Sequence, residues 1–345
     1  MTAPLIVVKD LVKEYKTYDR RPGIGGAVKD LFSREYRTLR AVDNVSFEIQ
    51  RGEMVGYIGA NGAGKSTTIK ALCGILFPTS GVVKVDGRVP WIDREEHVQH
   101  IGAVFGQRSQ LWWDLAAGES LRLLGRIYNV PQAEFDARME EFEQVLKLND
   151  FIKTPARKLS LGQKMRCELA ASLIHGPPIL FLDEPTIGLD VAAKQSIRDF
   201  VKRINRERKV TVILTTHDLR DIEELCSRVI ILDKGRVIFD GTLDALRDKA
   251  TDSGLLTFSL TRAIESGWTP ENLPVLGIDW KPHGATLTAT LSRSAPHRAE
   301  VIRAVLDRYG EIVQDIAIEE AQLEHVIQRI YSGSGAGSGA GRSVK

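Results

Sequence analysis

A glycine-rich run near the start of the chain has the composition and spacing of a phosphate-binding loop. It reads Gly59-Ala60-Asn61-Gly62-Ala63-Gly64-Lys65-Ser66 and fits the pattern GxxxxGK[ST]. Its glycines let successive backbone N–H groups point inward around phosphate oxygens, and a helix that begins there adds the positive end of its dipole. We expect Lys65 to reach the β- and γ-phosphates of a nucleotide and the Ser66 hydroxyl to hold Mg²⁺. The run does not fit GxGxxG, which argues against a dinucleotide site.

A second chemical signal is the pair of adjacent carboxylates Asp183 and Glu184, which follow the apolar run Ile179-Leu180-Phe181-Leu182. The run predicts a buried strand, and α/β proteins bind ligands at the carboxyl ends of such strands. Asp183 is then placed to organise Mg²⁺ and its water molecules. Glu184 stays free to polarise the water that attacks the γ-phosphate, as a general base or as a group that positions the water.

The elements that must position these groups are apolar strands and helices that alternate up to about residue 247. Strands buried on both faces read as continuous apolar runs, so the alternation predicts an α/β fold with a mostly parallel core sheet. Residues 107–172 carry helical patterns and hardly any strand, which predicts a helical subdomain inserted into the sheet. The predicted strands are 55–58, 82–85, 179–182, 210–214 and 229–232, and the predicted helices are 66–73, 134–147, 165–175 and 192–206.

Residues 248–331 differ in pattern and predict a small α+β accessory domain. The expected strands are 255–260, 285–291 and 312–318, and the expected helices are 299–309 and 323–331. No catalytic constellation is found in this part of the sequence. Residues 332–345 are a Gly/Ser/Ala tail, which we expect to be flexible and to lie outside the fold.

Residues 17–40 form an unusual basic segment with apolar residues between its charges. Read at helical spacing, such a segment predicts a basic insertion that lies against anionic headgroups or against helices of a partner. A solvated helical insertion is an equally weighted alternative. Its basic residues are Arg20, Arg21, Lys29, Arg34, Arg37 and Arg40.

Composition narrows the class of protein. Basic residues number 47 and acidic residues 45, so a net charge of +2 gives no argument for a nucleic-acid partner, and none is expected. The cysteines Cys73, Cys167 and Cys226 lie far apart in apolar contexts without CxxC spacing, which predicts reduced, buried thiols. No stretch approaches the roughly 18 apolar residues that a membrane-spanning helix needs. Work at a membrane would therefore require a partner.

Residues 5–246 resemble the nucleotide-binding subunit of an ATP-binding cassette (ABC) transporter, a P-loop NTPase cassette. Besides the phosphate loop and the carboxylate pair, four motifs carry the resemblance, and all six follow in the family's order. They are Gln107 in VFGQRSQLWWDL, the run Leu159–Gln163, the run Gly188-Leu189-Asp190, and His217 in LTTHDL. The resemblance implies an ATP hydrolase that binds ATP and Mg²⁺, with an antiparallel β part beside the parallel sheet.

The resemblance also implies a role for each motif. Glu184, His217 and Gln107 are expected to be catalytic: Gln107 touches Mg²⁺ or the attacking water, and His217 donates a hydrogen bond to the γ-phosphate and to Glu184. The expected Mg²⁺ ligands are Ser66, Gln107 and Asp183. The residues expected to contact ATP are Tyr15, Gly59, Asn61, Gly62, Gly64, Lys65, Ser66, Thr67, Ser160, Gly162, Gln163 and Asp190.

Tyr15 is the aromatic residue expected to stack on adenine, because the family places one in the upstream context that reads VKEY here. The insertion at 17–40 separates this position from the sheet. Tyr18 and Tyr36 therefore remain alternatives.

The run Leu159-Ser160-Leu161-Gly162-Gln163 contains no acid, base, nucleophile or metal ligand. In the family this run begins a helix whose N-terminus points at the γ-phosphate bound by a second copy. The resemblance thus implies a homodimer or a pair of cassettes, with Ser160 and Gly162 closing the partner's site and Asp190 at the interface. Leu161 departs from the family's usual glycine, so it either points away from the nucleotide or changes how the pair closes.

The insertion, the accessory domain and the region GQRSQLWWDL are similar to drug- and viologen-type exporters related to daunorubicin-resistance pumps. This implies a peripheral protein on the cytoplasmic face of the inner membrane that drives a separately encoded permease. Trp112 and Trp113 are candidates for the permease contact or, equally, for packing within the helical subdomain. The alternatives are a polysaccharide or teichoic-acid exporter, a soluble cassette ATPase acting on ribosomes or DNA, and a nucleotide switch without transport.

Overall fold

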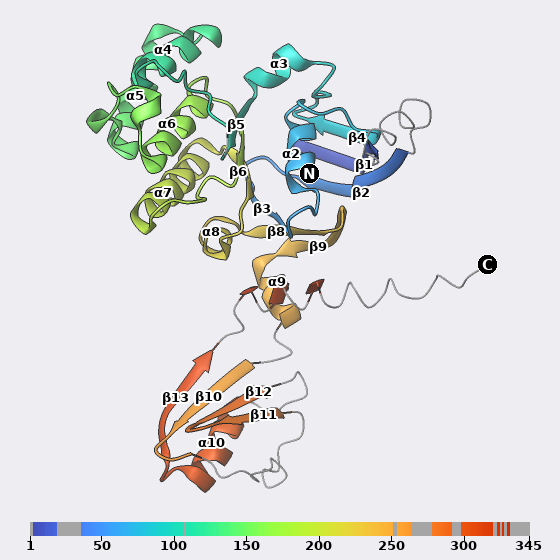
Figure 1. Ribbon diagram of the computed structural model, residues 1–345, viewed down its shortest axis with the longest axis vertical. Helices are drawn as coiled ribbons and strands as arrows, with labels where there is room; N and C mark the ends of the chain where they lie inside the picture. Colours follow the sequence, from blue (N-terminus) through green and yellow to red (C-terminus); the bar gives the residue numbers. More distant parts are fainter. Residues whose placement is uncertain are drawn as a thin grey trace, which may run out of the picture. The chain divides into compact units, whose positions relative to one another are not determined.

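The computed structural model describes residues 3–18, 36–106, 108–250, 254–263, 278–291 and 298–319, together with 323–324, 326–327 and 330–331 (Figure 1). The chain divides into two compact units, Met1–Gly241 and Thr242–Lys345. The first unit contains two sheets and the second contains one, and each unit has its own apolar core.

The first unit is built on a six-stranded sheet with the strand order β5-β6-β7-β3-β8-β9. The pairs β5–β6, β6–β7, β7–β3 and β3–β8 are parallel, which confirms the predicted α/β fold with a mostly parallel core. Central strands such as β7 are buried at every position, as expected when both faces of a sheet are covered. The strands are β3 Met54–Gly59, β5 Ile101–Phe105, β6 Ile179–Asp183, β7 Thr211–Thr215, β8 Arg228–Asp233 and β9 Arg236–Thr242.

A separate three-stranded antiparallel sheet has the order β2-β1-β4 and comprises β1 Ile6–Tyr18, β2 Tyr36–Ile49 and β4 Ser80–Val85. The predicted strand 82–85 therefore exists as β4 but belongs to this sheet rather than to the parallel one. Helix α2, Lys65–Leu72, contacts β3 and β6 on one side and β2 and β4 on the other, so it packs between the two sheets. The short helix α3, Arg94–Gln99, leads into β5.

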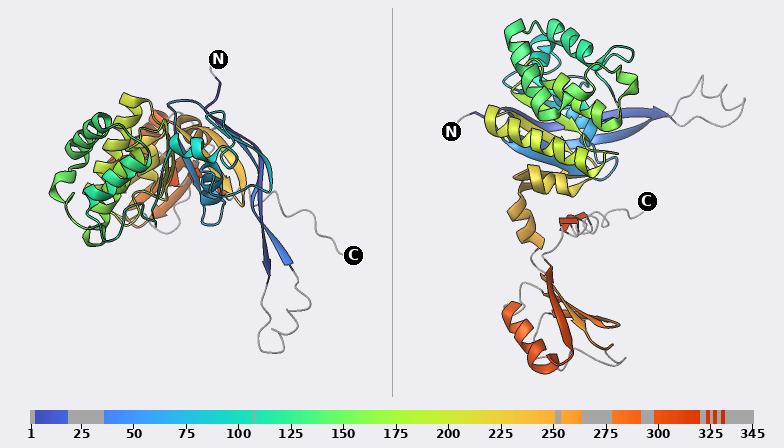
Figure 2. Two further views of the ribbon diagram at one scale, coloured as in Figure 1. Left: turned by 90° about the horizontal axis from the view of Figure 1, so that it is seen from above. Right: turned by 90° about the vertical axis from the view of Figure 1, so that its left-hand side faces the viewer.

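The helical interpretation of residues 17–40 is wrong at both ends of that segment. Thr17 and Tyr18 end β1, and Tyr36–Arg40 begin β2, with Thr17 opposite Arg37 and Tyr18 opposite Tyr36. The pairing of β4 with β1 stops at Val12. Beyond that point β1 and β2 continue together as a two-stranded ribbon (Figure 2). Residues 19–35, with most of the basic side chains, lie outside the described residues.

Helices gather on the opposite side of the parallel sheet from the three-stranded sheet (Figures 1 and 2). The described residues between β5 and β6 hold α4 Ala117–Ile127, α5 Gln132–Leu146 and α6 Leu161–Leu173, and no strand. Helix α7, Val191–Arg208, packs against α5 through an edge-on contact of Phe142 and Phe200 whose ring centroids are 6.0 Å apart. Helix α8, Leu219–Leu225, packs against α7.

The second unit contains helix α9, Leu243–Ala250, and a four-stranded antiparallel sheet with the order β11-β12-β10-β13. Helix α10, Arg298–Tyr309, supplies Val301 and Val305 to a core that also contains Phe258 and Trp280. Strand β11 has no counterpart among the predicted strands. The strands are β10 Gly254–Leu260, β11 Ile278–His283, β12 Thr286–Leu291 and β13 Val313–Glu319.

The described part of 323–331 is helical, and the predicted tail 332–345 lies outside the described residues. Cys73, Cys167 and Cys226 are free and buried, as predicted. Among the described residues, no helix has the length and apolar character needed to cross a membrane.

Candidate functional site

The phosphate loop connects β3 to α2, which is the strand–loop–helix context that the sequence predicts. Gly62 and Gly64 both have positive φ, 81° and 102°. A side chain on Gly64 is excluded for a second reason, because its Cβ would lie 2.5 Å from the carbonyl oxygen of Ala41 in β2. The three-stranded sheet therefore packs directly against the loop and fixes its left-handed turn.

Lys65 is buried, with 6% of its surface exposed, at the first position of α2. Its Nζ donates to the carbonyl oxygens of Gly59 at 2.6 Å and Ala60 at 3.1 Å. Burial lowers the pKa of Lys65 below its usual value, while the nearby carboxylates of Glu184 and Asp183 oppose that shift. The ammonium is thus held inside the loop, on the side where the carboxylates lie.

Asp183 ends β6 and faces two hydroxyl groups. Thr215 Oγ1 donates to Asp183 Oδ1 at 2.5 Å, and Ser66 Oγ donates to the same oxygen at 3.3 Å. Mg²⁺ in nucleotide enzymes is held by one or two protein oxygens together with substrate phosphates and water. Ser66 and Asp183 form an all-oxygen pair of this kind, so the residues present fit a magnesium ion bound with nucleotide.

Glu184, one residue beyond the end of β6, meets His217, two residues beyond the end of β7. His217 Nε2 lies 2.7 Å from Glu184 Oε1. Glu184 has a positive φ of 57°, which is uncommon for a residue with a side chain and is frequent at functional sites. Its N–H donates to the carbonyl oxygen of Thr215 at 2.9 Å, with the Thr215 hydroxyl oxygen at 3.2 Å. The backbone is therefore held in a conformation that turns the carboxylate toward the histidine.

A cavity of about 560 Å³ opens at this edge of the sheet. Its lining combines residues from the phosphate loop, from the ends of β5 and β6, and from the loop after β7. Gln107 itself lies outside the described residues, but its neighbours Gly106 and Arg108 line the cavity. The predicted site residues that the cavity brings together are Asn61, Ser66, Asp183, Glu184 and His217.

The run at the start of α6 does not line this cavity. Ser160 is the N-cap of α6: its Oγ accepts from the Gln163 N–H at 3.2 Å, and Gln163 Oε1 accepts from the Ser160 N–H at 2.9 Å. Asp190 likewise caps α7 by accepting from the Ala193 N–H at 2.8 Å. These residues have structural roles within the chain and are not next to its own phosphate loop.

Leu161 is exposed and approaches the turn that carries Gly188. A Cβ on Gly188, whose φ is 71°, would lie 3.1 Å from Leu161 Cδ2. Leu161 therefore covers the loop before α7 within the same chain. Spacing alone did not reveal this contact, because the two residues are far apart in the sequence.

Tyr15 lies half-buried in β1, opposite Leu39 of β2. The same stretch of β2 reaches the phosphate loop at Ala41, so Tyr15 is close to that loop along the ribbon. Lys13 Nζ lies 5.2 Å from the centre of the Tyr15 ring. The adenine-stacking role stays a prediction, and the side chains of Tyr18 and Tyr36 lie outside the description.

Sequence reasoning missed a set of polar residues, most of them buried, behind the Glu184–His217 contact. Thr215 binds Asp183, and a network joins the loops after β6 and β7 to helices α7 and α8. The only local signal was the pair of hydroxyl residues in LTTHDL. The network residues are Thr186, Arg198, Thr216, Asp218 and Asp221.

Comparison with known proteins agrees with this geometry. Residues 42–187 match the family described as ABC transporter. The chain is 34% identical over 233 residues to the ABC transporter ATP-binding protein NatA of Bacillus subtilis (strain 168), which covers 68% of this chain and 94% of the relative. It is 31% identical over 294 residues to the daunorubicin resistance ATP-binding protein DrrA3 of Streptomyces coeruleorubidus, which covers 85% of this chain and 92% of the relative.

Among solved structures, the dimeric post-hydrolysis state of the ATP-binding cassette MJ0796 bound to ADP and Pi is 29% identical, with a TM-score of 0.57. It covers 69% of this chain and 98% of the other. The phosphate loop, the carboxylate pair and the histidine at one sheet edge, together with these similarities, show that the chain belongs to the ATP-binding subunits of ABC transporters, which bind and hydrolyse ATP.

Proposed function

We propose that this chain is the ATPase subunit of an exporter and that it works as a head-to-tail pair around two ATP molecules with Mg²⁺. The observation that carries the catalytic part is the 2.7 Å contact between His217 Nε2 and Glu184 Oε1, beside the hydroxyl–carboxylate pair Ser66–Asp183. In our proposal, residues 1–247 carry the ATPase activity and residues 248–331 form an accessory domain.

In this mechanism Lys65 exchanges its hydrogen bonds to the loop carbonyls for hydrogen bonds to the β- and γ-phosphates, which are charged and therefore stronger acceptors. Ser66, Asp183 and Gln107 would hold Mg²⁺, which would supply positive charge beside the phosphates. Glu184 accepts a hydrogen bond from a water molecule and orients that water toward the γ-phosphate. His217 holds Glu184 through one ring nitrogen and contacts the γ-phosphate.

Pairing supplies the groups that one chain lacks at its own cavity. MJ0796, a similar cassette, forms a dimer in its ADP- and Pi-bound state. In the pair we propose, Ser160, Gly162 and Gln163 of one chain bind the γ-phosphate in the other, since the N-terminus of α6 is a favourable anion site. Asp190 and the adjacent turn lie at the interface.

The transport part rests on the relatives. DrrA3 is named for daunorubicin resistance, and its similarity spans more residues than the 241 of the first unit, so it includes part of the second unit. The linearmycin resistance ATP-binding protein LnrL of Bacillus subtilis (strain 168) is 36% identical over 209 residues. We infer that the chain drives a separate permease to export a small hydrophobic or cationic compound, from the cytoplasmic face of the membrane.

Replacement of Glu184 by glutamine tests the catalytic assignment. Glu184→Gln should lower the ATPase rate by roughly 100-fold or more, because an amide is a poor base, while ATP still binds. The variant should then accumulate as an ATP-bound dimer, measured by sedimentation with and without ATP. The matched control is Glu207→Gln on the exposed side of α7, which should keep the wild-type rate. A Glu184→Gln enzyme that retained most of its activity would contradict the assignment.

The transport assignment has its own test. Co-expression with a candidate permease should bring the chain into the membrane fraction, and the pair should lower accumulation of a cationic dye in cells. Without the permease the chain should stay out of that fraction. Membrane binding that needs no permease, or dye levels that are the same for wild type and Glu184→Gln, would count against an exporter.

A further inference from the structure

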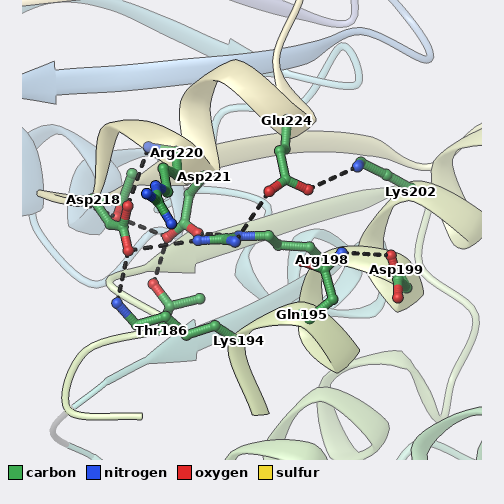
Figure 3. A network of polar contacts seen from close by, with 11 residues as sticks. Thr186, Lys194, Gln195, Arg198, Asp199, Lys202, Asp218, Arg220, Asp221 and Glu224 are labelled. Carbon is green, nitrogen blue, oxygen red and sulfur yellow. Dashed lines mark hydrogen bonds and ion pairs between the residues drawn. The ribbon is translucent and has the colours of Figure 1, made fainter. Parts of the chain in front are cut away.

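A network of polar side chains with a buried centre joins the loops after β6 and β7 to helices α7 and α8 (Figure 3). At its centre is Asp221 of α8, whose side chain is fully buried. Arg198 of α7 donates from Nε to Asp221 Oδ1 at 2.6 Å. A buried carboxylate is stable only when its charge is paired and its oxygens accept hydrogen bonds, and here both conditions are met.

The second oxygen of Asp221 joins the loop after β6 to the loop after β7 at a point behind the Glu184–His217 contact. Thr186 Oγ1 donates to Asp221 Oδ2 at 2.5 Å, and Thr216 Oγ1 donates to the same atom at 3.0 Å. Both threonines are buried. Thr186 follows Glu184 with only Pro185 between them, and Thr216 immediately precedes His217. One oxygen atom therefore links the segment that carries Glu184 to the segment that carries His217.

The backbone on either side of this link restricts the positions of Glu184 and His217. Pro185 has a restricted φ, so the position of Thr186 limits where Glu184 can lie. On the other side, the Thr216 hydroxyl also accepts from the Asp218 N–H at 2.9 Å, which fixes the backbone around His217. The loops are thus held together in front by the Glu184–His217 contact and behind by Asp221.

A smaller cavity of about 270 Å³ lies beside the residues of both links. Glu184 and His217 line it, and so do Thr186 and Thr216. Side chains beside a cavity have room to move, so the 2.7 Å contact is not enforced by packing on this side. The bonds of Thr186 and Thr216 to Asp221, together with the bond from the Glu184 N–H to the Thr215 carbonyl oxygen, hold the two loops together.

Lys194 and Asp218 complete the network at the edge of this cavity. Lys194 Nζ donates to Asp218 Oδ2 at 2.7 Å, and Arg198 Nη2 lies 3.5 Å from the same oxygen. Burial alone would raise the pKa of Asp218, but the hydrogen bond and charge of Lys194, with Arg198, lower it below its usual value. Asp218 is therefore a stable anion that anchors the start of α8 to α7.

We propose that Asp221 is a positioning residue for ATP hydrolysis: by accepting from both Thr186 and Thr216 it sets the distance between Glu184 and His217. This inference rests on the catalytic roles proposed above for Glu184 and His217. Asp221 touches neither of them and acts only through the two threonines and their backbone.

Single hydroxyl deletions test each arm of the link. Thr186→Val and Thr216→Val keep the branched shape but remove the donor. Since small misplacements of catalytic groups are costly, each should lower kcat about tenfold. The KM for ATP should stay within about twofold, because the phosphate loop and Lys65 are unchanged. Thr186→Ser and Thr216→Ser restore a hydroxyl and should recover most of the rate.

Two controls separate positioning from general stability. Glu224→Gln removes another carboxylate bound to Arg198, at 3.1 Å, which contacts neither threonine, so kcat should be unchanged. In a His217→Ala background the histidine no longer needs positioning, so Thr216→Val should lower the residual rate by much less than tenfold. Additive effects of these two substitutions would show that Thr216 acts independently of His217 and would overturn the proposal.

Asp221→Asn provides a second route if the valine variants do not fold. It keeps the shape and one carbonyl acceptor but loses the charge, and it should lower kcat without raising KM. Wild-type kcat in Asp221→Asn, or in both folded valine variants, would refute the positioning role. If that result came while Glu184→Gln was inactive, the catalytic assignment would stand; an active Glu184→Gln enzyme would instead refute the assignment itself.

Discussion

The Lys65 ammonium is bound to two backbone carbonyl oxygens in a loop that has Gly62 and Gly64 in left-handed conformations. Neutral carbonyls compensate a buried charge only partly, which agrees with the lowered pKa of this lysine. A bound nucleotide supplies full negative charge at the same place. Nucleotide binding therefore relieves a local electrostatic cost in this loop.

Lys65→Ala should weaken ATP binding itself, by about tenfold or more, because a charge-assisted hydrogen bond to phosphate is lost. Titration calorimetry or a fluorescent ATP analogue would measure the change. Lys84→Ala, on the exposed edge of β4, is the control with the same change in net charge and should bind ATP normally. Unchanged affinity in Lys65→Ala would contradict the phosphate role.

A second residue-scale prediction concerns pH. His175 stacks on Tyr128, with ring centroids 4.0 Å apart, and its Nε2 lies 3.0 Å from the carbonyl oxygen of Ile101. Burial lowers the pKa of His175 to about 4, although the Ile101 contact opposes the shift. The unfolded chain takes up this proton near pH 6.5, so stability falls as the pH drops from about 6.5 to about 4.

His175→Phe keeps an aromatic ring that cannot be protonated. Between pH 7 and pH 5 the wild type should lose about 2 kcal/mol more of its unfolding free energy than this variant does. Urea unfolding at the two pH values measures the difference. Equal losses in the two proteins would show that His175 is not buried as a neutral ring.

At the residue scale, the sequence was sufficient to predict the location of the side chains that lie at the carboxyl ends of strands. Asp183, Glu184 and His217 meet where expected because parallel strands end at one edge. The sequence could not indicate that Glu184 has a positive φ or that Asp221 lies behind it, since both depend on packing between distant segments. Gln107 and Tyr15 remain predictions.

At the scale of elements, Ser160 at the N-terminus of α6 has two roles. Within the chain, Ser160 and Gln163 form a reciprocal cap that satisfies two N–H groups at the start of the helix. In the proposed pair, the same serine faces the other chain's γ-phosphate. The two uses predict two separable effects of one substitution.

Ser160→Ala should lower the unfolding free energy by about 1 kcal/mol, the usual cost of a lost N-cap. The ATPase rate should fall much further than such a small loss of stability explains. Thermal unfolding and steady-state ATPase assays on one preparation would compare the two, with Ser80→Ala on exposed β4 as the control. A rate that fell no further than the control's would argue that Ser160 is only a cap.

Two errors at this scale share a physical cause. A short apolar run such as Val82–Val85 predicts a strand but does not say which sheet it joins, and that is decided by pairing with the distant β1. In residues 17–40, charged and apolar residues fit helical spacing, but the ends of the segment pair with each other as β1 and β2. Long-range pairing overrides a local pattern.

At the scale of the whole molecule, the chain contains two separate apolar cores, one in each unit. The core of the second unit includes Phe258, fully buried, with its ring 6.4 Å from that of Trp280. Phe258→Ala should destabilise this unit by about 3–5 kcal/mol. ATP should stabilise the first unit, which alone contains the phosphate loop.

Calorimetry should therefore resolve two transitions that respond separately. Phe258→Ala should lower one Tm, and ATP with Mg²⁺ should raise the other. If both changes acted on a single transition, the two units would unfold as one cooperative body.

The position of Ser160 away from its own chain's cavity has a consequence for mixtures of subunits. In the proposed pair, an inactive chain still presents its α6 N-terminus to a neighbour and occupies the place of a working partner. Cells that carry one intact and one defective copy of the gene would hold many mixed pairs. Such a defect would then be dominant in inheritance, and the activity lost would exceed the fraction of defective chains.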